Sequence, residues 1–303
     1  MNLPNSKETW EDHISLLQKE EEPTKNSKEE IIPLLANLLE ETIVSAAKVA
    51  LSKGKIGVLF SGGVDSTLIC FVLKKFNIPF DAITVGFQDN NEQKLPDDIL
   101  ESRIVAKDLS LKYHEVILDF LQAENLFKKI VNILGEDLNN VVNVGVGSVE
   151  LAGIQELKKI DPAITEIFGG LGSEEIFAGY KRHLDSSNRH EECWLGLKSM
   201  FERDLMRDLG IAKSEGIRFY TPFLDKELIS FSMNIDDSLK LNEKGAKMIL
   251  REAARHSGLP ENFAFRPKKA AQYGSRTDRA IAKLAKQKGF KYKKDYINSI
   301  LIK

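Results

Sequence analysis

Residues 57–66 place a turn rich in serine and glycine between an apolar run and a hydrophobic helix. The run before the turn has the composition of a buried strand, and Ser66 to Leu73 continues as a buried helix. Glycine lets the backbone of such a turn take positive φ, and the free N–H groups of the helix N-terminus attract an anion. We therefore expect phosphate at residues 61–66. The alternative, a plain turn capped by Asp65, accounts for the two glycines but not for the two flanking serines.

The turn differs from a mononucleotide P-loop because no lysine follows the glycine pair. The pattern S-G-G-x-D-S, from Ser61 to Ser66, resembles the pyrophosphate loop of the ATP pyrophosphatase superfamily. Members of that superfamily split ATP between its α and β phosphates. The resemblance therefore implies that pyrophosphate is the leaving group.

The elements that must hold this turn alternate between strands and helices. Strands are expected at residues 56–60, 80–87, 113–118 and 165–168, and helices at 29–51, 66–73, 97–111, 121–134 and 145–157. A strand, helix, strand order implies right-handed parallel crossovers. Beyond Ile176 the expected elements are helices, at residues 195–209, 225–233, 244–257 and 277–288.

We predict an α/β fold with a doubly wound, mostly parallel sheet and a helical C-terminal half. The expected parts are a helical N-terminal extension (residues 1–50), an α/β ATP pyrophosphatase core (51–185) and a helical part of the same domain (186–303). A second glycine turn, at residues 169–175, follows the fourth expected strand. Because ligands bind beyond the carboxyl ends of parallel strands, both glycine turns should face one cleft.

Six blocks of sequence, taken in order, resemble a single family. They are Ser61–Ser66, Val85–Phe87, Gly170–Tyr180, Tyr220–Asp225, Leu250–Ala253 and Arg266–Lys269. Together they resemble the synthetase domain of asparagine synthetases and the related β-lactam synthetases. The resemblance implies a ligase that activates a carboxylate on ATP as an acyl-adenylate, releases pyrophosphate and lets ammonia or another amine displace AMP. Aspartate is the first candidate for the carboxylate, and ATP and Mg²⁺ are the implied cofactors.

The resemblance also implies the residues that bind the nucleotide. They are Phe60, Ser61, Gly62, Gly63, Asp65, Ser66, Val85, Gly86, Gly169 and Gly170. The first turn would cradle pyrophosphate, the strand ends would line the adenine site, and the second turn would let the backbone approach the nucleotide. Asp65 and Glu174 would hold Mg²⁺, a hard cation suited to carboxylate oxygens.

Lys268 is the implied catalytic cation, acting together with Asp65. It would stabilise charge at the α-phosphate. Taken alone, Lys268 could be a surface lysine beside Lys269, but Arg266-Pro267-Lys268 matches the Arg-x-Lys block of the family. Asp225 either touches substrate or caps a helix. Tyr180 and His183 are either cleft residues or packed residues.

Two positions depart from the family pattern. Leu171 stands where asparagine synthetases have glutamate and β-lactam synthetases have the tyrosine of an acid–base pair. An alkyl group cannot accept a proton, and loss of a general base costs roughly 10²–10⁴ in rate. Glu175, Glu150 and His183 are the candidates for a substitute base. Glu174 replaces the usual aspartate and keeps oxygen ligation at longer reach.

Glutamine-dependent members of the family begin with a glutaminase domain whose nucleophile is a cysteine directly after the initiator methionine. Position 2 is asparagine here, and only a short helical stretch precedes the first turn. We therefore expect nitrogen to come from free ammonia, from a separate glutaminase subunit or from another amine. A second copy of this chain, forming a homodimer, is a further candidate partner.

Composition narrows the remaining classes of function. A net charge of -2 gives no general attraction to nucleic acid or membrane, and the basic residues 283–294 lack a set of stacking aromatic side chains. The two cysteines, Cys70 and Cys193, form no metal motif and indicate a reducing compartment. No leader or long apolar span is apparent, so the cytoplasm is the expected location.

Two other functions compete with the ligase. One is a tRNA-modifying enzyme of the same superfamily, which the near-neutral charge and the absence of a cysteine pair disfavour. The other is a regulator that binds ATP without turnover, which Leu171 favours. The joint presence of Asp65, Glu174 and Lys268 favours the enzyme, because such charges are costly to hold together without a ligand.

Overall fold

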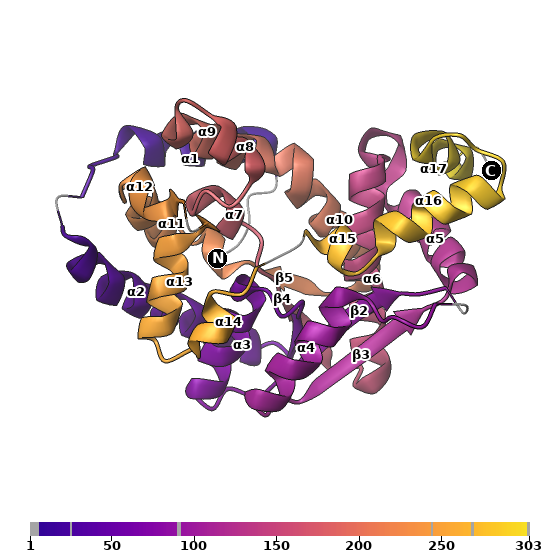
Figure 1. Ribbon diagram of the computed structural model, residues 1–303, viewed down its shortest axis with the longest axis horizontal. Helices are drawn as coiled ribbons and strands as arrows, with labels where there is room; N and C mark the ends of the chain where they lie inside the picture. Colours follow the sequence, from indigo (N-terminus) through magenta and orange to yellow (C-terminus); the bar gives the residue numbers. More distant parts are fainter. Residues whose placement is uncertain (1–5, 25, 90–91, 244, 268–269, 302–303) are drawn as a thin grey trace.

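A computed structural model describes residues 6–24, 26–89, 92–243, 245–267 and 270–301. Its centre is a sheet of five strands in the order β3-β2-β1-β4-β5 (Figure 1). The strands are β1 (Lys55–Leu59), β2 (Phe80–Phe87), β3 (Tyr113–Leu118), β4 (Ile164–Phe168) and β5 (Arg218–Tyr220). Every neighbouring pair in this sheet is parallel, so the predicted doubly wound α/β fold is confirmed.

The strand order reverses between β1 and β4. From β1 the chain adds β2 and β3 on one side of the sheet, and β4 and β5 lie on the other side. Val58 of β1 pairs with Phe168 of β4, and the register of this strand pair shifts once, between Lys55 and Ile56. In open α/β sheets ligands bind beyond the carboxyl ends of the strands at such a switch point. Both glycine turns leave the sheet here, one after β1 and one after β4.

Helices cover both faces of the sheet (Figure 1). One hydrophobic core includes side chains of α2 (Lys28–Leu51), α3 (Val64–Lys75), α4 (Asp97–Asp108) and α13 (Met248–His256). The other includes side chains of α5 (Phe120–Leu138), α6 (Val141–Ile160), α10 (Met206–Glu215), α16 (Thr277–Gln287) and α17 (Lys293–Leu301). The strands contribute side chains to both hydrophobic cores. Val58 packs in the first core, and Ile83 and Val85 pack in the second.

Further helices, turns and short strands complete the described chain. They are α1 (Lys7–Lys19), α7 (Ser173–Ile176), α8 (Lys181–Asp185), α9 (Arg189–Met200), α11 (Lys226–Met233), α12 (Asp237–Lys240), α14 (Glu261–Ala264) and α15 (Ala271–Gly274). A π-helical turn, Phe201–Leu205, joins α9 to α10, and a 3₁₀ turn, Pro222–Leu224, follows β5. Two short antiparallel strands, β6 (Leu241–Asn242) and β7 (Gly245–Ala246), precede α13. No helix in the described ranges is both long and apolar enough to cross a membrane.

Local sequence explains several boundaries. Ser27 and Glu30 form a capping box at the start of α2, each side chain accepting a hydrogen bond from the backbone N–H of the other. The helix expected from residue 145 begins earlier, at Val141, because the side chain of Asn140 caps it. The sequence predicted helices beyond Ile176 and did not predict the strand β5, which joins the sheet there. β5 is only three residues long, too short to show a strand pattern in the sequence.

Candidate functional site

The turn between β1 and α3 closes on itself through its two serines. Ser66 Oγ accepts a hydrogen bond from Ser61 N at 3.2 Å and donates one to Gly63 O at 3.3 Å. Gly62 has a φ of +64°, and a Cβ there would lie 3.2 Å from Ser102 N. The N-cap of α3 is Gly63 and has no side-chain hydrogen bond within the described residues, so the alternative of an aspartate cap is wrong. The turn therefore leaves the helix N-terminus to an anion.

The second glycine turn packs directly against the first. A Cβ on Gly170 would lie 2.8 Å from the Cβ of Asp65, so only glycine allows the two turns to approach this closely. Gly169 N donates a hydrogen bond to Tyr220 O at 3.0 Å, which ties the turn to β5. The structure thus brings together the two turns that the sequence placed at the ends of separate strands.

A buried lysine links the two turns. The ammonium group of Lys247 donates hydrogen bonds to the carboxylate oxygens of Asp65 at 2.8 and 2.9 Å and to Ser173 Oγ at 2.9 Å. It also lies 2.8 Å from Glu174 Oε1. Its side chain is only 3% exposed. Lys247 was not predicted from the sequence. The one indication of it was its position three residues before Leu250–Ala253, one of the six blocks that resemble the family.

The backbone of Lys247 is itself unusual. It has a φ of +59° at the N-cap of α13, a left-handed conformation that costs a residue with a Cβ roughly 1–2 kcal/mol. Such strain is concentrated at functional sites, where the surrounding structure holds it in place. The conformation lets the lysine side chain enter the contact between the two glycine turns.

Asp65 and Glu174 fit a magnesium site that substrate completes. Both carboxylates lie 2.8 Å from one positive charge, the Lys247 ammonium group. Magnesium is usually held by one or two protein carboxylates together with phosphate oxygens and water, and this donor set provides two. In the described part of the chain no group of three or more His, Cys, Asp or Glu residues could hold a metal. A metal ion bound here would therefore need further ligands from a bound molecule or from water.

Two arginines connect the site to the segment that precedes Lys268. Arg251 donates a hydrogen bond to Arg266 O at 3.0 Å, and Arg266 donates one to Ser61 O at 3.4 Å. Burial lowers the pKa of Arg251. These contacts hold residue 266 beside the first glycine turn. Lys268 and Lys269, the predicted catalytic cation and its alternative, lie outside the described residues.

A cavity of about 140 Å³ lies at the ends of β1 and β2 and beside the second glycine turn. Its lining includes five of the predicted nucleotide residues, Phe60, Ser61, Val85, Gly169 and Gly170. Gly86 is not among the lining residues. A Cβ on Gly86 would lie 2.8 Å from both Pro96 and Ile99, so this glycine allows α4 to pack against β2.

Lys247 also lines a wider cavity, with a volume of about 570 Å³. Lys181, Lys247 and Arg251 line it together with Glu174. Among the described lining residues, three basic side chains and one acidic side chain suit a ligand that carries several negative charges. The contact between the two turns is therefore adjacent to a small cavity at the strand ends and to a wider, basic one.

Leu171 lies in the wall of the smaller cavity together with Glu150 and Asp208. Arg207 lies between these two acids, with its Nε 2.8 Å from Asp208 Oδ1 and 3.4 Å from Glu150 Oε2. Burial raises the pKa of both carboxyl groups. The sequence offered Glu150 as a substitute base, but nothing in it distinguished Arg207 or Asp208 from charges on a solvated helix face.

Glu175 and His183, the other two candidate bases, do not line this cavity. Glu175 is completely buried against Arg203, and burial raises its pKa to about 7. His183 is also completely buried, and burial lowers its pKa to about 4. His183 is therefore a packed residue. Tyr180 lines the wider cavity, and the guanidinium group of Arg182 lies 4.1 Å from the centre of its ring.

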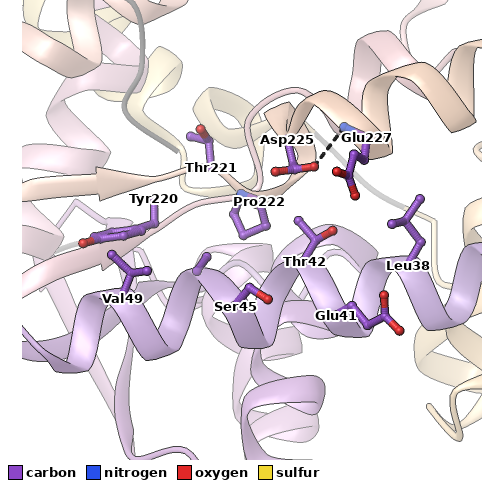
Figure 2. Close-up of a pocket in the computed structure, with 11 residues that line it drawn as sticks. Leu38, Glu41, Thr42, Ser45, Val49, Tyr220, Thr221, Pro222, Asp225 and Glu227 are labelled. Carbon is purple, nitrogen blue, oxygen red and sulfur yellow. Dashed lines mark hydrogen bonds between the residues drawn. The ribbon is translucent and has the colours of Figure 1, made fainter.

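Asp225 belongs to a separate cavity of about 270 Å³, which Figure 2 shows between α2 and the segment after β5. The carboxylate of Asp225 accepts hydrogen bonds from Glu227 N at 3.0 Å and Leu228 N at 3.5 Å. It is thus the N-cap of α11, and the helix-cap interpretation is confirmed. None of the predicted nucleotide or metal residues lines this cavity.

The sequence is similar to those of asparagine synthetases from other organisms. Of the curated relatives, the putative glutamine-hydrolyzing asparagine synthetase 1 of Methanocaldococcus jannaschii is 27% identical over 285 residues, which cover 82% of this chain and 50% of that protein. The glutamine-hydrolyzing asparagine synthetase of Gallus gallus is 28% identical over 255 residues, covering 80% and 43%. The chain therefore spans about half the length of these relatives, or less.

Solved structures align over most of the chain at low sequence identity. The NMN synthetase from Francisella tularensis covers 91% of this chain and 94% of its own, with a TM-score of 0.43 and 12% identity. The family model described as asparagine synthase matches residues 36–193 and 186–293, well over half of the chain. These residues include both glycine turns and Lys247. The chain belongs to the asparagine synthase family.

Proposed function

We propose that this chain is an ATP-dependent, AMP-forming carbon–nitrogen ligase. The observation that supports this most is the contact of the two glycine turns through Asp65, Lys247 and Glu174. A turn that presents backbone N–H groups, next to a buried cation and two carboxylates, has the parts needed to neutralise a departing pyrophosphate. Aspartate is the carboxylate to test first, because the matched relatives are named asparagine synthetases.

In the first half-reaction, a carboxylate oxygen of the substrate attacks the α-phosphorus of ATP. The bond from that phosphorus to the bridging oxygen breaks, and pyrophosphate leaves with the bonding electron pair. Residues 61–66 hold the departing phosphates through backbone N–H groups and hydroxyls, and Lys247 provides a positive charge beside them. Asp65 and Glu174 would hold Mg²⁺, which would supply further positive charge to the phosphate groups.

In the second half-reaction, an amine attacks the acyl carbon and AMP leaves. The nucleotide base and ribose lie in the smaller cavity, between Phe60 and Val85 on the strand ends and the second glycine turn. Lys268, which follows the segment held by Arg266, stabilises the negative charge at the α-phosphate in both steps. The nitrogen comes from ammonia or another amine, supplied free or by a glutaminase.

The test is pyrophosphate release by the purified chain with ATP, Mg²⁺ and aspartate, followed by amide and AMP formation when ammonium is added. We expect pyrophosphate release to require both ATP and aspartate. Asp65→Ala and Lys268→Ala should abolish it. A screen in which no amino acid, with ammonium present, causes pyrophosphate or AMP production would refute the proposal.

A regulator that binds ATP without turnover is the second candidate, and the alkyl side chain of Leu171 in the cavity wall favours it. Under this alternative the chain binds ATP tightly and forms neither pyrophosphate nor AMP. Recovery of turnover in Leu171→Glu would then show that the nucleotide site is intact and that a proton acceptor is missing.

A further inference from the structure

One end of the smaller cavity carries more acidic than basic groups. The guanidinium group of Arg207 lies 2.7 Å from Asp208, 3.3 Å from Asp204 and 3.4 Å from Glu150. Its side chain is 3% exposed. One buried positive charge therefore faces three carboxyl groups. Of these three, Glu150 and Asp208 line the cavity and Asp204 does not.

Of the two acids that line the cavity, Asp208 is held tightly by Arg207, whereas Glu150 is incompletely satisfied. Glu150 Oε2 is buried and accepts no hydrogen bond from any residue that the structure describes, and its distance to Arg207 Nε is that of an ion pair. The single guanidinium group of Arg207 cannot neutralise both cavity carboxylates, so this pair retains affinity for a proton or a cation. Asp204 differs, because Arg203 also binds it, at 2.6 Å.

The backbone fixes the position of this pair relative to the second glycine turn. Glu150 projects from α6, and Asp208 lies in the first turn of α10, just after the π-helical turn Phe201–Leu205. A π turn shifts the side chains that follow it around the helix axis, and such turns are frequent at functional sites. Gly170 and Leu171 line the same cavity, so a substrate carbonyl beside the second turn shares the cavity with the acidic pair.

We propose that Glu150 and Asp208 receive the amine substrate and accept the proton that it loses during amide formation. This inference rests on the ligase function proposed above. The amine nitrogen forms a bond to the acyl carbon, the carbon–oxygen bond to AMP breaks with its electron pair on the AMP oxygen, and one N–H proton passes to a carboxylate oxygen of the pair. Arg207 is a positioning residue that holds both acids at the cavity wall.

The experiment separates the two half-reactions in Glu150→Gln, Asp208→Asn and the matched control Asp204→Asn. The control removes a carboxylate from the same arginine without changing the cavity wall. Aspartate-dependent exchange of pyrophosphate into ATP reports adenylation, and amide formation from ammonium reports the second step. In the two cavity variants we expect exchange within about twofold of wild type and amide formation reduced by about 10²–10⁴.

Two further readouts distinguish proton transfer from a structural role. Hydroxylamine, a weaker base that is neutral near pH 7, should restore product formation in Glu150→Gln. With hydroxylamine as the amine, whose own protonation changes little above pH 7, product formation by wild type should rise with pH as the pair loses its proton, and this rise should be absent from Glu150→Gln. The charged groups that face the pair are Arg207 and Asp204, and Asp98 also lines the cavity from α4.

The results of these experiments either support or contradict the proposed role of Glu150 and Asp208. A selective loss of amide formation, with rescue by hydroxylamine, supports the proposal. An equal loss in both half-reactions, an equal loss in Asp204→Asn, or full amide formation in both cavity variants overturns it while leaving the ligase function standing. A wild-type chain without aspartate-dependent exchange overturns the ligase function itself, and this inference with it.

Discussion

Two buried ionic clusters border the cleft, and each has one basic side chain among acidic ones. In the first, Lys247 lies between Asp65 and Glu174. In the second, Arg207 contacts two acids of the smaller cavity and a third outside it. Removing a charge from water costs several kcal/mol even after relaxation, so both clusters depend on their partners.

The basic side chains of the two clusters suit different tasks. A lysine ammonium is a compact charge on a flexible stem and can exchange a carboxylate for a phosphate oxygen. An arginine guanidinium is planar and holds two carboxylates in fixed directions. The lysine cluster, beside the N-terminus of α3, is therefore suited to changing partners when a phosphate group binds. The arginine cluster is suited to keeping its geometry while a proton moves.

A large effect is expected from Lys247→Gln. Loss of the charge between Asp65 and Glu174 should lower the rate of pyrophosphate release by about 10²–10³, the range found for removal of one group that stabilises a transition state. The measurement is steady-state pyrophosphate release at saturating ATP and aspartate. Lys240→Gln is the matched control, since Lys240 is also fully buried but its acidic partner is Asp237, outside the cleft. If both variants lose only stability, Lys247 has a structural role.

The first cluster could be predicted in part from sequence. Asp65 and Glu174 each follow a strand by a few residues, so local pattern was enough to place them at one edge of the sheet. Lys247 is 182 residues from Asp65, and its side chain reaches the site only because a left-handed residue begins α13. No local pattern predicts that conformation in a lysine.

The second cluster was less predictable than the first. Helical periodicity indicated the helix that carries Glu150, but not which polar side chain on it would meet another element. Asp208 comes 58 positions later, and the two acids meet only where α6 packs against α10. The fold was easier to predict than the site, since strands and helices depend on local pattern and these clusters depend on packing between distant elements.

Glu175 is a third buried acid, and it tests whether a raised pKa alone indicates a catalytic role. The pKa of Glu175 is raised to about 7 by burial, from 4.5, so the folded state binds more protons between these values. The contribution of this carboxyl group to the free energy of unfolding is fully present below pH 4.5 and is lost as pH rises through 7. His183, whose pKa is lowered to about 4 by burial, acts in the opposite sense between pH 4 and 6.5.

Replacing Glu175 isolates its contribution. From pH 5 to 8, Glu175→Gln should gain up to about 3 kcal/mol of unfolding free energy relative to wild type. Urea unfolding of both proteins at the two pH values measures this change, and pyrophosphate release should stay near that of wild type. A stability difference that does not change with pH would mean that Glu175 is ionised in the folded state throughout this range.

The contact between the two turns gives a smaller effect. Gly170→Ala puts a methyl group 2.8 Å from the Cβ of Asp65 and should cost about 1–3 kcal/mol of stability while moving the turns apart. Gly169→Ala is the control for stability, because a Cβ there has no described atom within 4 Å. Thermal unfolding compares the two variants. Equal stability in both would mean that the turns can separate without cost.

The smallest effect is expected at Asp225, whose carboxylate accepts backbone hydrogen bonds from Glu227 and Leu228 at the start of α11. None of the predicted nucleotide or metal residues lines the cavity around Asp225 (Figure 2). Asp225→Ala should cost about 0.5–2 kcal/mol of stability, as is usual when a helix loses its cap. Asp225→Ser should recover most of that loss, because a serine hydroxyl can accept the same bonds. The Michaelis constants for ATP and aspartate should not change in either variant. A raised constant for aspartate in Asp225→Ser, at normal stability, would instead place this residue in the substrate site and extend the cleft beyond the two ionic clusters.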